Sequence, residues 1–145
     1  MSPTIKNVKT VHGSWLELES DAMHVRHAVF IQEQGVPAEL ETDDYDYLSM
    51  HVVIYDSQGG PIATGRLLPD GHIGRMAVLA QQRGQGLGAL VMQRLLSLAK
   101  EQQLHTLRLS AQTHALGFYQ GLGFVQQGDE YLEVGIPHVR MIREG

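Results

Sequence analysis

The sequence predicts a mixed α/β domain of the α+β type, in which helices flank a largely antiparallel central sheet. Two patterns lead to this fold class. Three strand-like runs between residues 51 and 79 are separated by short turns, and a glycine-rich turn, an amphipathic helix and another strand follow them. A chain of 145 residues with 43% hydrophobic and 19% charged side chains is typical of one globular domain, so we expect residues 1–145 to fold as a single unit.

The first third of the chain predicts one strand and one helix. Residues 6–11 favour a short first strand, and Ser-Trp-Leu-Glu at residues 14–17 has the form of a capping box, so a helix should begin near Trp15. Apolar residues then recur at helical spacing, and Gly35 should end the helix. Five carboxylates between residues 39 and 46 indicate a polar loop.

The middle of the chain predicts an antiparallel meander. Residues 51–55, 62–68 and 72–79 form three strand-like runs. The segments between them are Ser-Gln-Gly-Gly and Pro-Asp-Gly, which are strong turn signals. Because such short turns join antiparallel neighbours, we expect the three strands to lie side by side.

The last third of the chain predicts the rest of the sheet and two helices. The glycine-rich turn opens an amphipathic helix at about Leu87, and residues 107–111 form a strong strand. Residues 114–120 indicate a short helix ended by glycine, after which strands should begin at Phe124 and cover residues 139–142.

Composition excludes several classes of function. The chain has no cysteine, so disulfides, a thiolate nucleophile and cysteine-based metal sites are excluded. No other metal-ligand spacing occurs, and we expect no metal. A net charge of −5 disfavours a dedicated nucleic-acid binder. No apolar run is long enough for a membrane span or for the core of a signal peptide, so we expect a cytoplasmic protein without a membrane partner.

The segment Arg-Gly-Gln-Gly-Leu-Gly at residues 83–88 is the most informative in the chain. Its glycines let the backbone approach a ligand closely, and the free amides of the helix that follows point at one spot. This arrangement suits a phosphate or pyrophosphate, beside which Arg83 would add a positive charge. A glycine-rich turn that binds nothing is the alternative interpretation.

Known phosphate loops match this segment to different degrees. A P-loop is excluded because no Gly-Lys-Ser/Thr follows. A dinucleotide fingerprint matches formally at Gly84, Gly86 and Ala89, but the next strand ends without the acid that binds the ribose, which disfavours an NAD-binding protein. The remaining pattern, Arg/Gln-x-x-Gly-x-Gly/Ala, is met by Arg83, Gly86 and Gly88.

The order of these segments resembles that of the GNAT superfamily of acetyl-CoA-dependent N-acetyltransferases. The glycine loop, a helix and a strand are followed by Ala-Leu-Gly-Phe-Tyr-Gln-Gly-Leu-Gly-Phe at residues 115–124. Residues 25–37 and the Gly-Ile-Pro-His segment at 135–138 are similar to a small bacterial ElaA-like subgroup. The resemblance covers nearly the whole chain and is strongest from Met76 to Phe124.

The resemblance implies a GNAT-like sheet with two strands splayed around acetyl-CoA. The backbone of Met76, Ala77 and Val78 would pair with the pantetheine arm. The pyrophosphate would lie on the loop and the helix start, formed by Arg83, Gly84, Gln85, Gly86, Leu87, Gly88 and Ala89. Gln112 would add a polar contact, and Phe118 would pack near the cofactor or in the core.

The resemblance also implies that Tyr119 is the general acid that protonates the leaving thiolate, since a neutral phenol has an ordinary pKa of about 10. The base is not assigned, because the strand before the loop lacks the glutamate that many members use there. We rank His138 first for its place in the Gly-Ile-Pro-His turn. A water molecule is a further alternative, and so are other polar side chains: His51, His72, His114, Asp129 and Glu130.

The acceptor should bind near the first helix, where Arg26 and Glu33 are candidate contacts. The acidic run at residues 39–46 either draws a cationic amine to the site or is a solvated loop. We expect acetyl transfer to the primary amine of a small molecule or peptide by direct attack. The alternative is a catalytically weak module that binds CoA as a sensor or scaffold. The sequence is also compatible with a homodimer.

Overall fold

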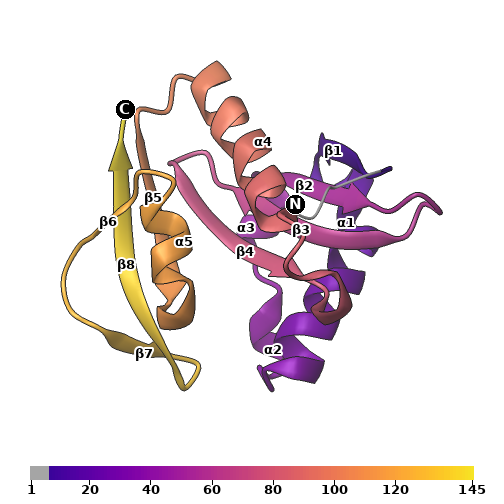
Figure 1. The fold of residues 1–145 in the computed structure, drawn as a ribbon, viewed down its shortest axis with the longest axis horizontal. Helices are drawn as coiled ribbons and strands as arrows, with labels where there is room; N and C mark the ends of the chain where they lie inside the picture. Colours follow the sequence, from indigo (N-terminus) through magenta and orange to yellow (C-terminus); the bar gives the residue numbers. More distant parts are fainter. Residues whose placement is uncertain (1–6) are drawn as a thin grey trace.

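The computed structural model describes residues 7–145, whose strands form one sheet in the order β1-β2-β3-β4-β5-β8-β6, with β7 paired to β8 (Figure 1). The fold class is therefore confirmed. In chain order, the strands are β1 (Lys9–Gly13), β2 (Met50–Tyr55), β3 (Pro61–Leu67), β4 (His72–Val78), β5 (Thr106–Gln112), β6 (Val125–Gln126), β7 (Tyr131–Glu133) and β8 (Ile136–Glu144).

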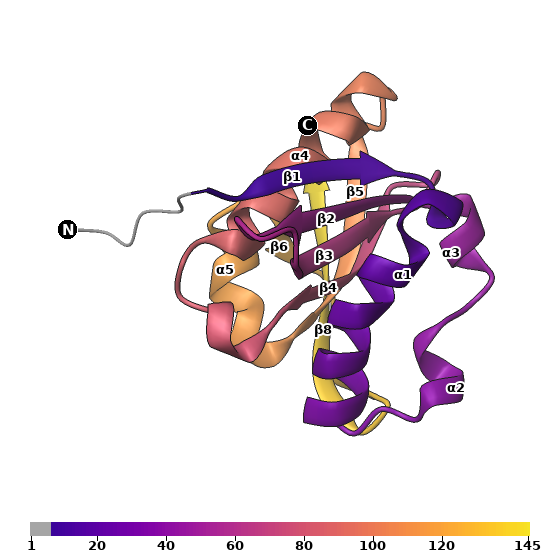
Figure 2. The same cartoon turned by 90° about the vertical axis from the view of Figure 1, so that its right-hand side faces the viewer.

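Two long helices cover opposite faces of this sheet. The helical segments are α1 (Trp15–Arg26), the π-helical η1 (His27–Glu33), α2 (Ala38–Glu41), α3 (Tyr45–Leu48), the 3₁₀ turn η2 (Ala80–Gln82), α4 (Leu87–Glu101), the 3₁₀ turn η3 (Thr113–Ala115) and α5 (Leu116–Gln120). Strand β2 shows the two layers directly, because alternate side chains point to opposite faces. Val52 and Ile54 belong to the core beneath α4, whereas Val53 packs against Trp15 of α1. Figure 2 shows α1 and α4 on the two sides of the sheet.

The predicted capping box starts helix α1. The Ser14 hydroxyl accepts a hydrogen bond from the Glu17 amide at 3.3 Å, and the Glu17 carboxylate accepts one from the Ser14 amide at 2.9 Å. Beyond Arg26 the helix widens to a π-helical pitch, which the periodicity does not predict. The Gln34 amide donates a hydrogen bond to the Val29 carbonyl, five residues earlier in the chain. The helical segment ends before Gly35, as predicted.

The sheet opens in the middle because β4 and β5 part from each other. Their parallel pairing covers only His72↔Arg108 and Ile73↔Leu109. The register of β4 against β3 also shifts after Gly74, and Arg75 in this bulge has φ of 50°. A bulge bends its strand, so β4 leaves β5 there, and the opposite edge of Met76–Val78 stays unpaired. The predicted splay of the two strands is confirmed.

The structure corrects some predicted boundaries. Strand β1 begins at Lys9, and Lys6 lies outside the described residues. The acidic segment is not a loop, because it contains the short helices α2 and α3. Strand β8 is longer than residues 139–142, and β7 was not predicted. Within residues 7–145 no helix has the length and apolar character needed to cross a membrane.

Candidate active site

The parting of β4 and β5 leaves a cleft of about 1150 Å³. It is lined by β4, the glycine loop and the start of α4 on one side, and by β5, η3, α5 and β8 on the other. Segment η1 and helix α2 border it as well. Of the residues predicted to bind a ligand or to catalyse, the cleft contains Glu33, Met76, Ala77, Val78, Arg83, Gly84, Gly86, Leu87, Gly88, Ala89, Gln112, Phe118, Tyr119 and His138.

The glycine loop has the backbone conformation of an anion-binding turn. Gly84 and Gly86 adopt φ of 83° and 79°, a left-handed region that favours glycine. The first bond of α4 runs from the Leu90 amide to the Gly86 carbonyl, so the amides of Leu87, Gly88 and Ala89 precede the helical ladder. No side chain caps this end, and all three residues line the cleft. The helix dipole therefore favours an anion at this point.

Arg83 ties the glycine loop to the end of η1. Its guanidinium donates to both carboxylate oxygens of Glu33, at 2.6 and 2.7 Å, and to the Val78 carbonyl at 3.0 Å. These hydrogen bonds lower the pKa of Glu33 and raise the pKa of Arg83. The two candidate ligand contacts are thus partners of each other, which the sequence does not indicate.

Gln112 and Gln85 were both predicted to contact the cofactor, but only Gln112 lines the cleft. Gln112 lines the cleft and exchanges hydrogen bonds with Gln34 at 2.9 and 3.3 Å, which links β5 to the chain after η1. Gln85 instead donates to Gln82 at 3.4 Å and is outside the cleft lining. Its side chain is therefore not placed to touch a ligand in the cleft.

Tyr119 is held in the cleft wall by aromatic packing. Its ring lies edge-on to Phe118 at 5.0 Å and to Phe124 at 6.1 Å, and the residue is only 8% exposed. Burial raises the pKa of Tyr119 to about 12. Burial is the sole cause of this shift, with no hydrogen bond to the hydroxyl among residues 7–145, so the hydroxyl is a protonated donor at the cleft.

His138 lies on β8, opposite Gln112 of β5 in the sheet register. Its Nδ1 lies 2.6 Å from the Ile136 carbonyl, so Nδ1 is the donor and the neutral ring has its lone pair on Nε2. The Glu133 carboxylate lies 3.5 Å from that Nε2.

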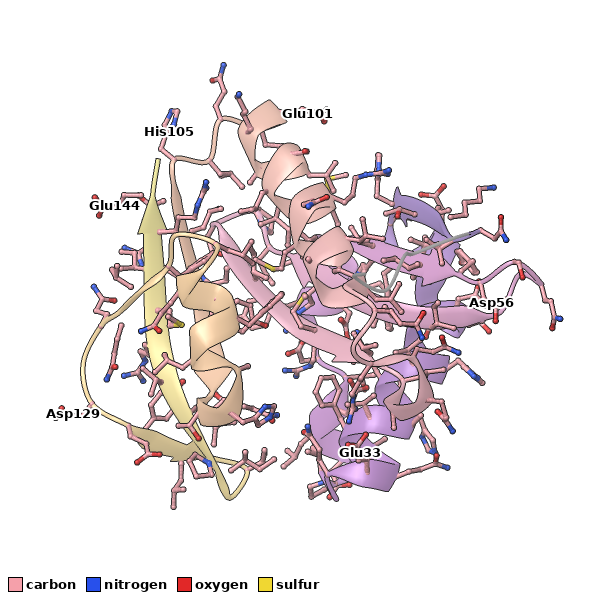
Figure 3. The ribbon with its side chains drawn as sticks, in the orientation of Figure 1. Glu33, Asp56, Glu101, His105, Asp129 and Glu144 are labelled. Carbon is pink, nitrogen blue, oxygen red and sulfur yellow. The ribbon has the colours of Figure 1, made fainter. Side chains whose placement is uncertain are left out.

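The other candidate bases are less suitably placed. His51 stacks on Trp15 and bonds the Asp46 carbonyl on the α1 side of the sheet, and burial lowers its pKa. His72 and His114 border the cleft, where they contact Asp70 and Gln112. The acids Asp129 and Glu130 are exposed on the connection before β7, and Figure 3 shows Asp129 on the outer side of the sheet, away from β4.

Arg26 does not line the cleft, which corrects its assignment as an acceptor contact. It is 1% exposed, and it donates to Glu41 at 2.5 Å and to Asp46 at 2.8 and 3.1 Å. Within the acidic run, Glu41 and Asp46 are therefore buried in ion pairs, whereas Glu39 and Asp44 are exposed.

Two further arginines complete this buried ion network. Arg66 donates to Asp43 at 2.7 Å and to Asp46 at 2.8 Å. Arg75 donates to Asp43 at 3.2 Å and to the Glu41 carbonyl at 2.9 Å. Arg75 lies on the strand that lacks the glutamate many family members use, and the sequence did not indicate that it would pair with the acidic run. Among residues 7–145 no group of three or more His, Cys, Asp or Glu is placed to hold a metal ion.

Comparisons with known proteins agree on one family. The family model described as "Acetyltransferase (GNAT) domain" matches residues 17–144. An uncharacterized N-acetyltransferase of Bacillus subtilis, YjcF, is 38% identical over 141 residues, which cover 94% of this chain and 100% of the relative. An acyl-CoA N-acyltransferase from Pseudomonas aeruginosa has 32% identity and a TM-score of 0.84, with 94% of this chain and 99% of that chain covered. Escherichia coli ElaA has 28% identity and a TM-score of 0.84 over the same shares of the two chains.

Proposed function

This chain belongs to the GNAT acetyltransferase family and is an acyltransferase enzyme, and from that premise we propose that it transfers an acetyl group from acetyl-CoA to a primary amine. One observation carries the proposal. The unpaired edge of β4 is followed, after η2 and the glycine loop, by the backbone amides at the start of α4 that have no partner within the helix. Tyr119 lines the same cleft. A sheet edge, an anion site and a proton donor are the three features that an acyl-CoA thioester needs.

The binding of the cofactor follows from this arrangement. The amides and carbonyls of Met76–Val78 that face away from β3 can pair with the amide groups of pantetheine, as an added strand would. The pyrophosphate then meets the amides of Leu87, Gly88 and Ala89. Arg83 can turn from Glu33 to the phosphates, since both side chains of this ion pair are partly exposed.

The chemistry is a direct transfer. The nitrogen of the neutral amine attacks the carbonyl carbon of the acetyl group, the C–N bond forms, and the C–S bond breaks with its electron pair on sulfur. Because a thiol has an ordinary pKa of about 8.5, a phenol with a pKa of about 12 cannot fully protonate the thiolate. Tyr119 therefore stabilises the leaving thiolate by donating a hydrogen bond, and water completes the proton transfer.

His138 is the base that we propose for the proton lost by the amine. The residue borders the cleft, and the Glu133 carboxylate lies 3.5 Å from its Nε2. The Nδ1 contact with the Ile136 carbonyl fixes the ring orientation. The proton then passes to water and replaces the one that the thiolate takes up, so a neutral amine and acetyl-CoA give one acetamide product and one CoA thiol with no net release of a proton.

Thermal unfolding with ligands tests the first part of the proposal. Acetyl-CoA and CoA should raise the melting temperature by mass action, whereas NAD and ATP should raise it much less. Thiol release over a panel of amines then tests catalysis. Equal stabilisation by NAD would overturn the assignment of the cleft to acyl-CoA. Binding of CoA without thiol release by any amine would favour the CoA-binding module instead.

A further inference from the structure

The carboxylates that line the cleft are already matched by cationic or histidine side chains. The pairs are Glu33 with Arg83, Glu41 with Arg26, Asp43 with Arg66 and Arg75, Asp70 with His72, and Glu133 with His138. One oxygen of Glu41 has no hydrogen bond, but it is buried away from the cleft solvent. Two of these carboxylates, Asp70 and Glu133, have only a histidine as partner, and Glu33 loses its partner if Arg83 turns to the phosphates. These three are the cleft carboxylates that remain open to an ammonium group.

Exposed apolar side chains also line the same cleft. Leu40 is 53% and Tyr45 is 54% exposed, and they come from α2 and α3. Val134, which is 48% exposed, lies in the turn between β7 and β8. All three line the cleft, and Figure 1 shows α2 and the β7–β8 turn at the same end of the molecule.

The backbone of Val134 supplies an independent observation. The turn between Glu133 and Ile136 has two residues, and both Val134 and Gly135 have positive φ, of 46° and 77°. Two-residue turns of this kind favour Asn-Gly, because a β-branched side chain is strained in the left-handed region. A strained residue beside a ligand cleft points to a role for its side chain.

We propose that Leu40, Tyr45 and Val134 hold the apolar substituent, aryl or branched alkyl, of the acceptor amine. This inference rests on the proposed function and names its acceptor class. The three side chains gain buried area when such a substituent lies between them, and that gain offsets the exposure and the strain seen in the ligand-free protein. Amines without an apolar substituent are disfavoured, because they would leave these three side chains exposed.

An acceptor panel tests the class directly. Initial rates of thiol release are measured with acetyl-CoA and phenethylamine, 3-methylbutylamine, ethanolamine or spermidine. We expect kcat/KM for the two apolar amines to exceed that for ethanolamine and spermidine by about tenfold or more. Spermidine or ethanolamine as the best acceptor would overturn the inference and leave the proposed function standing.

Val134→Asn separates specificity from stability. Asparagine suits the turn, so the melting temperature should rise by about 2–5 °C, while KM for phenethylamine rises by about 5–10-fold and that for ethanolamine does not change. Leu132→Asn is the matched control, since Leu132 is 70% exposed on the same hairpin but outside the cleft lining. Equal KM changes in the two variants would refute the role of Val134. If Val134→Asn does not fold, Val134→Gly removes the same side chain.

Calorimetric titration of the CoA complex distinguishes the two possible failures. If no amine is acetylated but phenethylamine still binds more tightly than spermidine, the proposed function fails and the inference holds for binding. If phenethylamine is not preferred over spermidine in binding or in turnover, the inference fails, whether or not the enzyme binds CoA.

Discussion

Replacing Tyr119 by phenylalanine removes a single hydroxyl group from the cleft wall and should impair only the chemical step. The ring contacts with Phe118 and Phe124 remain, and the hydroxyl has no hydrogen-bond partner among residues 7–145 to lose. We therefore expect the free energy of unfolding to change by no more than about 0.5 kcal/mol. The affinity for CoA should also change little.

The loss of rate follows from the hydrogen bond to the leaving sulfur. A hydrogen bond to a charged group contributes about 1.5–3 kcal/mol, and tenfold in rate corresponds to about 1.36 kcal/mol, so kcat should fall roughly 10–150-fold. Because the thiolate charge develops only in the transition state, kcat and kcat/KM should fall together. Steady-state thiol release measures both, with Tyr47→Phe as the control, since Tyr47 is 65% exposed and outside the cleft lining.

The pH dependence of kcat adds a second test of the same reasoning. Since the pKa of Tyr119 is raised to about 12, the phenol stays protonated through pH 10, and wild type and Tyr119→Phe should give parallel profiles from about pH 6 to 10. An alkaline limb with a pKa near 10 that only the variant lacks would refute the raised pKa. Equal kcat values would remove Tyr119 from the mechanism, and lost CoA affinity with kcat preserved would make it a binding residue.

The remaining predictions concern the loop and the buried ion network. Gly86→Val should abolish CoA binding in calorimetry while circular dichroism stays native, because valine disfavours the left-handed backbone and obstructs the phosphates; unchanged affinity would show that the loop does not hold them. Arg26→Met should destabilise the protein by about 3–5 kcal/mol and lower the melting temperature by about 10–15 °C, since two carboxylates are left buried; a loss no larger than that of the exposed-site control Lys100→Met would contradict this. Burial alone would raise the pKa of Asp43 and Asp46, but hydrogen bonds and charges from the arginines lower both below their ordinary value of 3.8. Their stabilisation is therefore complete above about pH 5 and is lost as the pH falls below 4, which acid titration followed by circular dichroism would reveal.

The parts of the fold that local patterns specify were predictable. The capping box at Ser14, the turn glycines of the meander and the periodicity of α4 each act through neighbours in the chain, so the sequence alone reveals them. The glycine loop is of the same kind, because its left-handed glycines and the start of α4 are contiguous in the chain. The π-helical widening of η1 and the short strand β7 depend instead on distant packing, and no local pattern marks them.

Most residues proposed to contact the cofactor line the cleft, but the ion pairs around Arg26, the proposed acceptor contact, were not predictable. Arg26, Glu41 and Asp46 meet only after folding, from positions up to 20 residues apart, so the acidic run looked solvated. The same holds for the pair Arg83–Glu33, which joins residues separated by 50 positions. Ion pairs between segments far apart in the chain form only in the folded protein, whereas composition gives only the net charge.

The unpaired edge of β4 has a consequence for the solubility of the protein. An open strand edge on an outer surface is a template on which a second molecule can add its own strand, and such addition leads to aggregation. Here the edge formed by Met76–Val78 lies inside the fold, facing the wall made by β5, α5 and β8. A thin, extended ligand can reach it, while the opposite wall stands where a foreign sheet would have to continue. The unpaired amide and carbonyl groups of Met76–Val78 can therefore stay accessible to a ligand while other protein molecules cannot add a strand to them.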